Sequence, residues 1–135
     1  EKFPIIFDVG CFRGYFSKKI FDALKIKKIK FYLYDPNKNV KNYLLDTFKK
    51  KYQKNIFNYK NIAIGKKNEK NYYYFNRFWE SSGSSLSNLL EKDKLFIFSR
   101  KFILKLLFQT TPNFTKISVN TTTINTEFKR KKLKK

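Results

Sequence analysis

The sequence has 135 residues, 41% of them hydrophobic and 19% aromatic, so it is long enough to bury one core and too short for several domains. It carries 31 Lys and Arg against 10 Asp and Glu, a formal net charge of +21 that raises the question of a polyanion partner. A single cysteine, Cys11, excludes an internal disulfide, and no stretch reaches the roughly 18 apolar residues of a membrane-spanning helix. We expect one cytoplasmic globular domain over residues 1–135.

The sequence is expected to be part of a longer protein. It contains no methionine, it begins with Glu, and a strand is already under way at Phe3. The single domain expected over residues 1–135 is therefore itself expected to be a fragment of a longer chain.

The first part of the chain alternates between patterns typical of strands and of amphipathic helices. Short apolar runs bounded by Gly or Pro indicate strands, and apolar residues every fourth position indicate helices. The expected elements are a strand at 3–8 buried on both faces, a helix at 15–25 with Phe16, Ile20 and Leu24 inward, a strand at 29–34, a helix with Val40, Leu44 and Phe48 inward, and a strand at 56–64. This order predicts half of a doubly wound α/β sheet with parallel strands.

The second part is less regular. We expect a strand at 71–76 and a Ser- and Gly-rich loop at 79–88 that is suited to act as a lid. Residues 95–108 form a basic amphipathic pattern, which fits a helix packed on the sheet better than one lying on a membrane surface. A strand at 117–125 is expected to precede the basic block at 128–135.

The chemistry-bearing residues follow the first two predicted strands. Gly10 and Gly14 come directly after the first strand and before a helix, where bare backbone lets a ligand approach. Their spacing differs from the G-x-G-x-x-G of dinucleotide sites, and Asp8 would repel a diphosphate. S-adenosylmethionine fits better, because it is cationic and its ribose hydroxyls need an acceptor. Asp35, at the end of the second strand, is placed to supply that acceptor.

The order of five motifs resembles the N-terminal part of the FkbM-type methyltransferases. These motifs are FDVGCFRGYFS at 7–17, YDPN at 34–37, NIAIG at 61–65, SSGSSL at 81–86 and VNTTTIN at 119–125. The resemblance implies a Rossmann-like class I methyltransferase fold, with helices on both faces of a mostly parallel sheet, that binds S-adenosylmethionine. It also implies methylation of a hydroxyl on a sugar or another small-molecule acceptor.

The resemblance also assigns residues. Asp8, Gly10 and Gly14 match the family's glycine-loop motif, Asp35 matches the ribose-binding acid, and Asn61 and Ala63 fall where adenine would be flanked. The chain departs from the family pattern with Asp35 in place of the usual Glu and Asn125 in place of the usual Asp. The acidic strand motif with which the family continues is not reached, so the fold and active site are expected to be incomplete at the C-terminus.

The catalytic residues and the meaning of the charge stay open. The chain has no His to act as a base, Glu80 and the serines at 81–85 are candidate acceptor-side residues, and no group of side chains suggests a metal site. The lysines either reflect an AT-rich coding composition, which we favour, or serve a polyanion. An RNA methyltransferase or another basic nucleic-acid-binding protein is therefore the alternative function.

Overall fold

The computed structural model describes residues 3–24, 29–48, 56–76, 98–99, 102–103, 105–106 and 114–131, to which all structural statements below refer. The chain separates into two compact units, one formed by Glu1–Glu69 with Asn120–Lys135 and the other by Lys70–Val119. Every predicted cofactor residue falls in the first unit.

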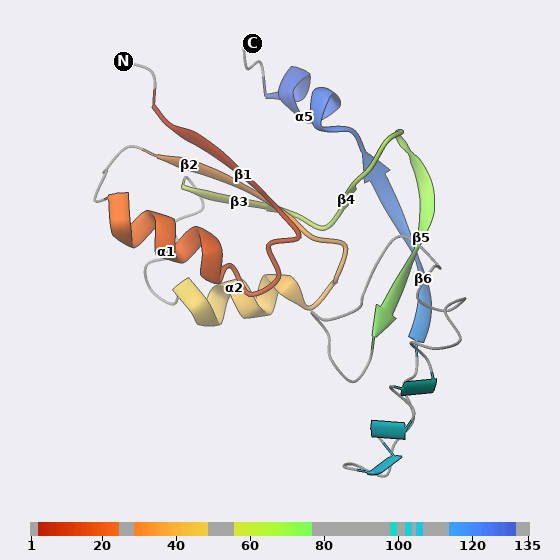
Figure 1. Cartoon of the computed structure of the whole chain (residues 1–135). Coiled ribbons are helices and arrows are strands. Elements are labelled where there is room, and N and C mark those ends of the chain that lie inside the picture. Colours follow the sequence, from red (N-terminus) through yellow and green to blue (C-terminus); the bar gives the residue numbers. More distant parts are fainter. Residues whose placement is uncertain are drawn as a thin grey trace. The chain divides into compact units, whose positions relative to one another are not determined.

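The first unit contains a three-stranded parallel sheet. The strands β1 (Ile5–Val9), β2 (Lys30–Tyr34) and β3 (Phe57–Lys60) lie in the order β1-β2-β3. Helices α1 (Tyr15–Leu24) and α2 (Val40–Phe48) form the two crossovers, as Figure 1 shows. The predicted βαβαβ order and the α/β class are confirmed.

The two faces of the sheet are covered by different helices, because side chains alternate between faces along each strand. Phe31 on β2 meets Phe21 of α1, with ring centroids 6.4 Å apart. On the other face, Phe7 on β1 contacts Phe128 at 4.7 Å, and Phe128 belongs to α5 (Ile124–Arg130). Figure 1 shows α1 and α2 on one side of the sheet and α5 on the other.

The core lies between the sheet and the α1–α2 layer. The Phe57 ring of β3 stacks on Phe31 with centroids 4.9 Å apart, and it packs at a tilt against Phe48 of α2 with centroids 4.1 Å apart. The prediction for α2 is confirmed, since the side chains at its inward positions are all buried. The buried cluster consists of Cys11, Ile29, Phe31, Leu33, Val40, Leu44, Phe48 and Phe57.

Two predictions about burial are wrong. Phe3 and Ile5, within the segment predicted to be buried on both faces, are 47% and 38% exposed, because β1 lies at an edge of the sheet and one of its faces is covered only in part. Phe16 and Leu24 of α1 are also exposed, while Ser17 on the same helix is fully buried. The inward face of α1 is thus rotated from the predicted one.

The third predicted strand is divided. β3 ends at Lys60, and a short β4 (Ala63–Ile64) pairs in parallel with β6 (Phe114–Thr122), so that Ala63 lies opposite Thr121. The strand predicted at 117–125 ends too late, because α5 begins at Ile124. Thr123 causes this change, since its side chain accepts a hydrogen bond from the Thr126 amide at 3.1 Å and caps the helix.

The second unit contains most of β5 (Glu69–Asn76) and of β6, which are neighbours in a sheet of order β4-β6-β5. Within it, the Lys116 ammonium lies 4.0 Å from the centre of the Tyr72 ring. Of the helix predicted at 95–108, residues 98–99, 102–103 and 105–106 are helical. Their apolar side chains are exposed, so the predicted packed stripe is not seen there. The loop predicted at 79–88 lies outside the described residues.

None of the helices in the described ranges is both long and apolar enough to cross a bilayer.

Candidate cofactor site

The loop that joins β1 to α1 is held against the end of β2. The amides of Gly10 and Cys11 both donate to the Tyr34 carbonyl, at 2.8 and 3.2 Å. The loop contains three residues with positive φ, namely Gly10 at 75°, Phe12 at 41° and Gly14 at 70°. This left-handed backbone, which favours glycine, turns the chain sharply from the strand into the helix.

The two loop glycines meet different surroundings. A Cβ at Gly14 would lie 2.6 Å from Leu44 Cδ2 and 2.9 Å from Phe48 Cε2, so the core of α2 requires glycine there. A Cβ at Gly10 would meet no atom within 4 Å. Gly10 therefore borders open space, and it is the position at which a ligand can approach the loop backbone.

Asp35 joins the glycine loop to the end of β2. Its Oδ2 accepts the Phe12 amide at 3.0 Å, and its Oδ1 accepts the Asn37 amide at 2.8 Å. Burial raises the pKa of Asp35 and the Asp8 charge raises it further, while these two amide hydrogen bonds lower it, with a net upward shift. Asp35 as a whole residue is only 5% exposed, and each carboxylate oxygen retains a lone pair for a second donor. The predicted proximity of Asp35 to the glycine loop is thus a feature of the fold.

Asn37 and Tyr59, which the sequence reasoning did not assign to the site, surround Asp35. The Tyr59 hydroxyl contacts the carbonyls of Asp35 and Asn37, at 3.1 and 3.2 Å. Asn37 is 3% exposed, and its Oδ1 accepts the Asn39 amide at 2.9 Å. Its Nδ2 has no hydrogen-bond partner among the described residues. The YDPN motif contains Asn37, but a sequence does not reveal that the Asn37 Nδ2 donor lacks a hydrogen-bond partner among the described residues.

The two adenine-flanking candidates are placed differently. Asn61 donates from Nδ2 to the Asp35 carbonyl at 3.0 Å, so it lies beside the ribose-binding candidate. Ala63 is buried in the β4–β6 pair at 4% exposure, and no hydrogen bond ties it to Asp35. The role of each beside an adenine ring stays a prediction.

Asp8 points toward α1. Ser17 is fully buried, and its hydroxyl donates to Asp8 Oδ2 at 2.5 Å. Burial raises the pKa of Asp8, and the Ser17 hydrogen bonds offset part of that rise. Asp8 therefore links β1 to α1 and helps to fix how the helix is rotated against the sheet.

The nearby thiol is not suited to nucleophilic chemistry. Cys11 is 6% exposed, and its pKa is raised by burial and by the negative charges of Asp35 and Asp8. A protonated thiol is a poor nucleophile, so Cys11 serves as a packing residue in the core cluster.

No catalytic base is identified. The sequence contains no His, and Glu80 and the serines at 81–85 lie outside the described residues. Within the described ranges, no three His, Cys, Asp or Glu side chains are grouped as metal ligands would be.

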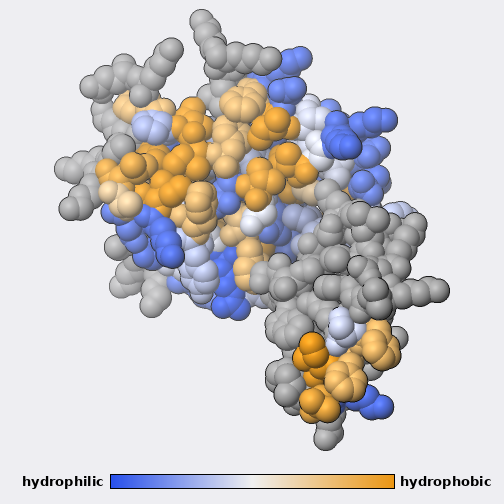
Figure 2. All heavy atoms as spheres, in the orientation of Figure 1, coloured by the Kyte–Doolittle hydropathy of each residue, from blue (hydrophilic) through white to orange (hydrophobic). Residues whose placement is uncertain are grey.

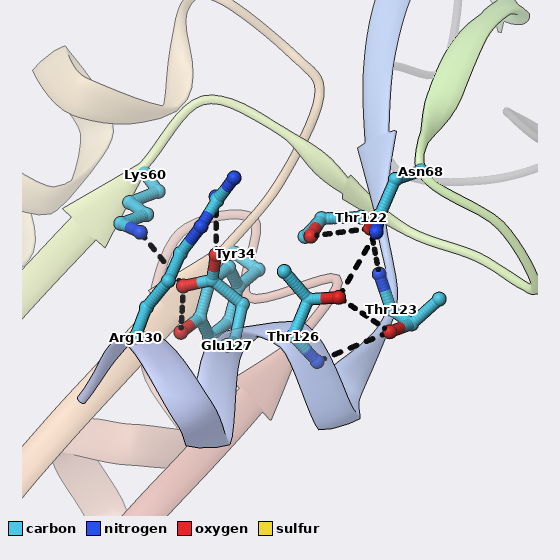
Figure 3. Close-up of polar contacts among 8 residues, drawn as sticks. All are labelled: Tyr34, Lys60, Asn68, Thr122, Thr123, Thr126, Glu127 and Arg130. Carbon is cyan, nitrogen blue, oxygen red and sulfur yellow. Dashed lines mark hydrogen bonds and ion pairs between the residues drawn. The ribbon is translucent and has the colours of Figure 1, made fainter. Parts of the chain in front are cut away.

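A buried ion cluster on the opposite face of the sheet was missed by the sequence reasoning. Glu127 of α5 is fully buried, and its Oε2 accepts Lys60 Nζ at 2.7 Å and the Tyr34 hydroxyl at 3.0 Å. Its Oε1 accepts Arg130 Nη1 at 2.9 Å, as Figure 3 shows. Burial alone would raise the pKa of Glu127, but the Lys60, Tyr34 and Arg130 interactions together lower it.

The ion cluster is connected to the candidate site through the backbone, because Tyr34 and Lys60 directly precede Asp35 and Asn61. One sequence signal could have found Glu127, which is the only acidic residue after Asp93.

The side chain of Asn68 binds the residues at the start of α5. Its Oδ1 accepts hydrogen bonds from the Thr122 hydroxyl and the Thr123 amide, both at 3.0 Å, and its Nδ2 donates to the Thr126 hydroxyl at 3.0 Å (Figure 3). These bonds fix the point at which β6 ends and the helix that carries Glu127 begins.

No protein-family model matches this sequence, and neither a curated protein nor a solved structure shows a significant match.

Proposed function

We propose that the chain forms the cofactor-binding part of an S-adenosylmethionine-dependent methyltransferase that acts on a hydroxyl of a sugar or another small-molecule acceptor. The observation that carries this proposal is the direct contact between the Phe12 amide of the glycine loop and the Asp35 carboxylate. The carboxyl ends of parallel strands are where doubly wound sheets bind nucleotide-like ligands.

The chemistry of the residues fits this cofactor. Asp35 offers carboxylate lone pairs for ribose hydroxyls, and Gly10 leaves open space beside the loop backbone. The two carboxyl groups, Asp8 and Asp35, suit a cationic ligand better than a diphosphate. The cofactor, when bound, supplies the methyl group for transfer, and the chain's task is to orient it.

Asn37 gives the proposal a second support. A buried donor without a partner costs about 1–3 kcal/mol in a folded protein, so its presence calls for an explanation. In a ligand-binding site, such a donor pairs with an acceptor atom of the ligand. The ribose or adenine of the cofactor provides acceptors of this kind next to Asp35.

The first experiment is calorimetric titration of the protein with S-adenosylmethionine and S-adenosylhomocysteine. We expect saturable binding by the wild type and a loss of at least about tenfold in affinity in Asp35→Asn, because the amide removes one acceptor and the negative charge. Asp46→Asn is the matched control, since Asp46 is an exposed acid on α2. A folded wild type that binds neither compound would overturn the proposal.

A second variant tests the buried Nδ2 donor of Asn37. Asn37→Ser keeps an oxygen for the Asn39 amide but removes Nδ2, so we expect unchanged or slightly higher thermal stability together with weaker cofactor binding. A decrease in stability with unchanged affinity would show that Asn37 serves the fold alone.

A further inference from the structure

The face of the sheet that α5 covers carries a strip of cationic side chains. Lys30 shares this face with Tyr32 and Tyr34, because these residues alternate with Phe31 and Leu33 along β2. Lys60 lies opposite Tyr34 in the register of β2 and β3. α5 and the residue after it add Arg130 and Lys131 to the same face, where Lys131 Nζ lies 4.6 Å from the centre of the Tyr32 ring.

These cations outnumber the acids on the same face. Glu127 is the one acid of this strip, and Lys60, Arg130 and Tyr34 already engage both of its oxygens. Burial lowers the pKa of Lys131, and the positive charges of Lys60 and Lys30 lower it further. Like charges from separate elements therefore converge here, which a locally Lys-rich sequence does not explain.

We propose that this strip, consisting of Lys30, Lys60, Arg130 and Lys131, binds the phosphate backbone of single-stranded nucleic acid. Lys30 and the residue opposite Lys60 are four positions apart on β2, a span of about 13 Å in a parallel strand. A strip of this length suits a ligand with several phosphates in a row.

Single-stranded nucleic acid fits better than the other polyanions. Duplex grooves are read by inserted helices or ribbons, whereas α5 has seven residues and places Glu127 and Phe128 against the sheet. Binding to a membrane surface draws on apolar side chains that insert among the lipids. The apolar neighbours here, Ile5, Val9 and Phe128, are 38%, 52% and 36% exposed, but they lie on a strand and on a seven-residue helix and do not form the long amphipathic helix that lies in a membrane interface. Figure 2 shows hydrophilic residues gathered around α5 and apolar residues over β1.

The test compares two variants that remove equal charge. Lys30→Gln/Lys131→Gln neutralises part of the strip and leaves the partners of Glu127 in place. Lys66→Gln/Lys67→Gln removes two exposed lysines elsewhere in the first unit. Circular dichroism establishes that both variants are folded. Binding of a fluorescent 20-nucleotide oligouridine is then measured by anisotropy from low to moderate salt.

We expect the strip variant to lose at least about tenfold in affinity at 0.1 M salt, and its slope of log affinity against log salt to fall by about 1.4, at about 0.7 per lost phosphate contact. The control variant should change affinity by less than about threefold. This proposal does not depend on the cofactor, because the wild-type titration with RNA needs no S-adenosylmethionine.

Three results would overturn the proposal. The first is a wild type that does not bind the oligonucleotide at moderate salt. The second is an equal loss in both variants, which would show that net charge alone drives binding. The third is strip-dependent binding to phosphatidylserine vesicles without binding to RNA, which would assign the strip to a membrane surface.

Discussion

At the scale of single residues, the two loop glycines allow the stability cost of backbone strain to be measured apart from the cost of overpacking. Both have positive φ, but only at Gly14 would an added methyl group collide with Leu44 and Phe48. We expect Gly14→Ala to lower the free energy of unfolding by about 2–4 kcal/mol, from strain plus overpacking, and Gly10→Ala to lower it by about 1 kcal/mol, from strain alone. Urea denaturation of both variants measures the difference, and equal losses would contradict this account.

The sequence indicated the positions of the candidate site residues better than their contacts. Asp35 was found because an acid follows a buried strand, and its place beside the loop follows from parallel pairing. The sequence did not predict the hydrogen bond between Ser17 and Asp8, because that bond depends on how α1 is rotated. Asn37 was not assigned, since an unpaired donor is defined by the atoms around it.

At the scale of elements, the hydrogen bonds of Glu127 to Tyr34 and Lys60 hold α5 against the sheet. Glu127→Gln keeps the shape of the side chain but removes the charge that Lys60 and Arg130 bind. Both partners are partly exposed and can be hydrated again, so we expect a loss of about 1–3 kcal/mol at pH 7. Tyr34→Phe, which removes one hydrogen bond to the same carboxylate, should cost about 1 kcal/mol.

The cost of Glu127→Gln should depend on pH. The pKa of Glu127 in the fold is lower than its ordinary value of 4.5, so its stabilisation is present above pH 4.5 and is lost as the pH falls through the lower folded value. The stability difference between wild type and variant should therefore be largest near neutrality and shrink below pH 4.5. Urea denaturation from pH 3 to 7 measures it, and a difference that stays constant would contradict the ion cluster.

Two elements show why pattern alone was not sufficient. In α1, the spacing of Phe16, Ile20 and Leu24 predicted one inward stripe, but the hydrogen bond between Ser17 and Asp8 fixes another rotation. Near the C-terminus, a run of β-branched residues predicted a strand that continues to 125. The Thr123 cap ends that strand early, and it thereby places Glu127 against the sheet.

At the scale of the whole molecule, a net charge of +21 works against compactness. Salt screens this repulsion over distances of about 10 Å at 0.1 M. We expect the melting temperature to rise by about 5 °C, roughly 1 kcal/mol, between low salt and 0.3 M NaCl. Lys19→Gln/Lys66→Gln/Lys67→Gln should show a smaller rise, and a melting temperature independent of salt would show that the lysines repel one another little.

The same salt has an opposite consequence for solubility, which follows from the position of β1. No strand of the described ranges pairs with the outer edge of β1, and Ile5 and Val9 on it are exposed. Such edges are templates for pairing between copies, and repulsion among highly charged molecules holds them apart. Screening by salt removes that repulsion, so the added salt that stabilises each molecule also favours association between molecules.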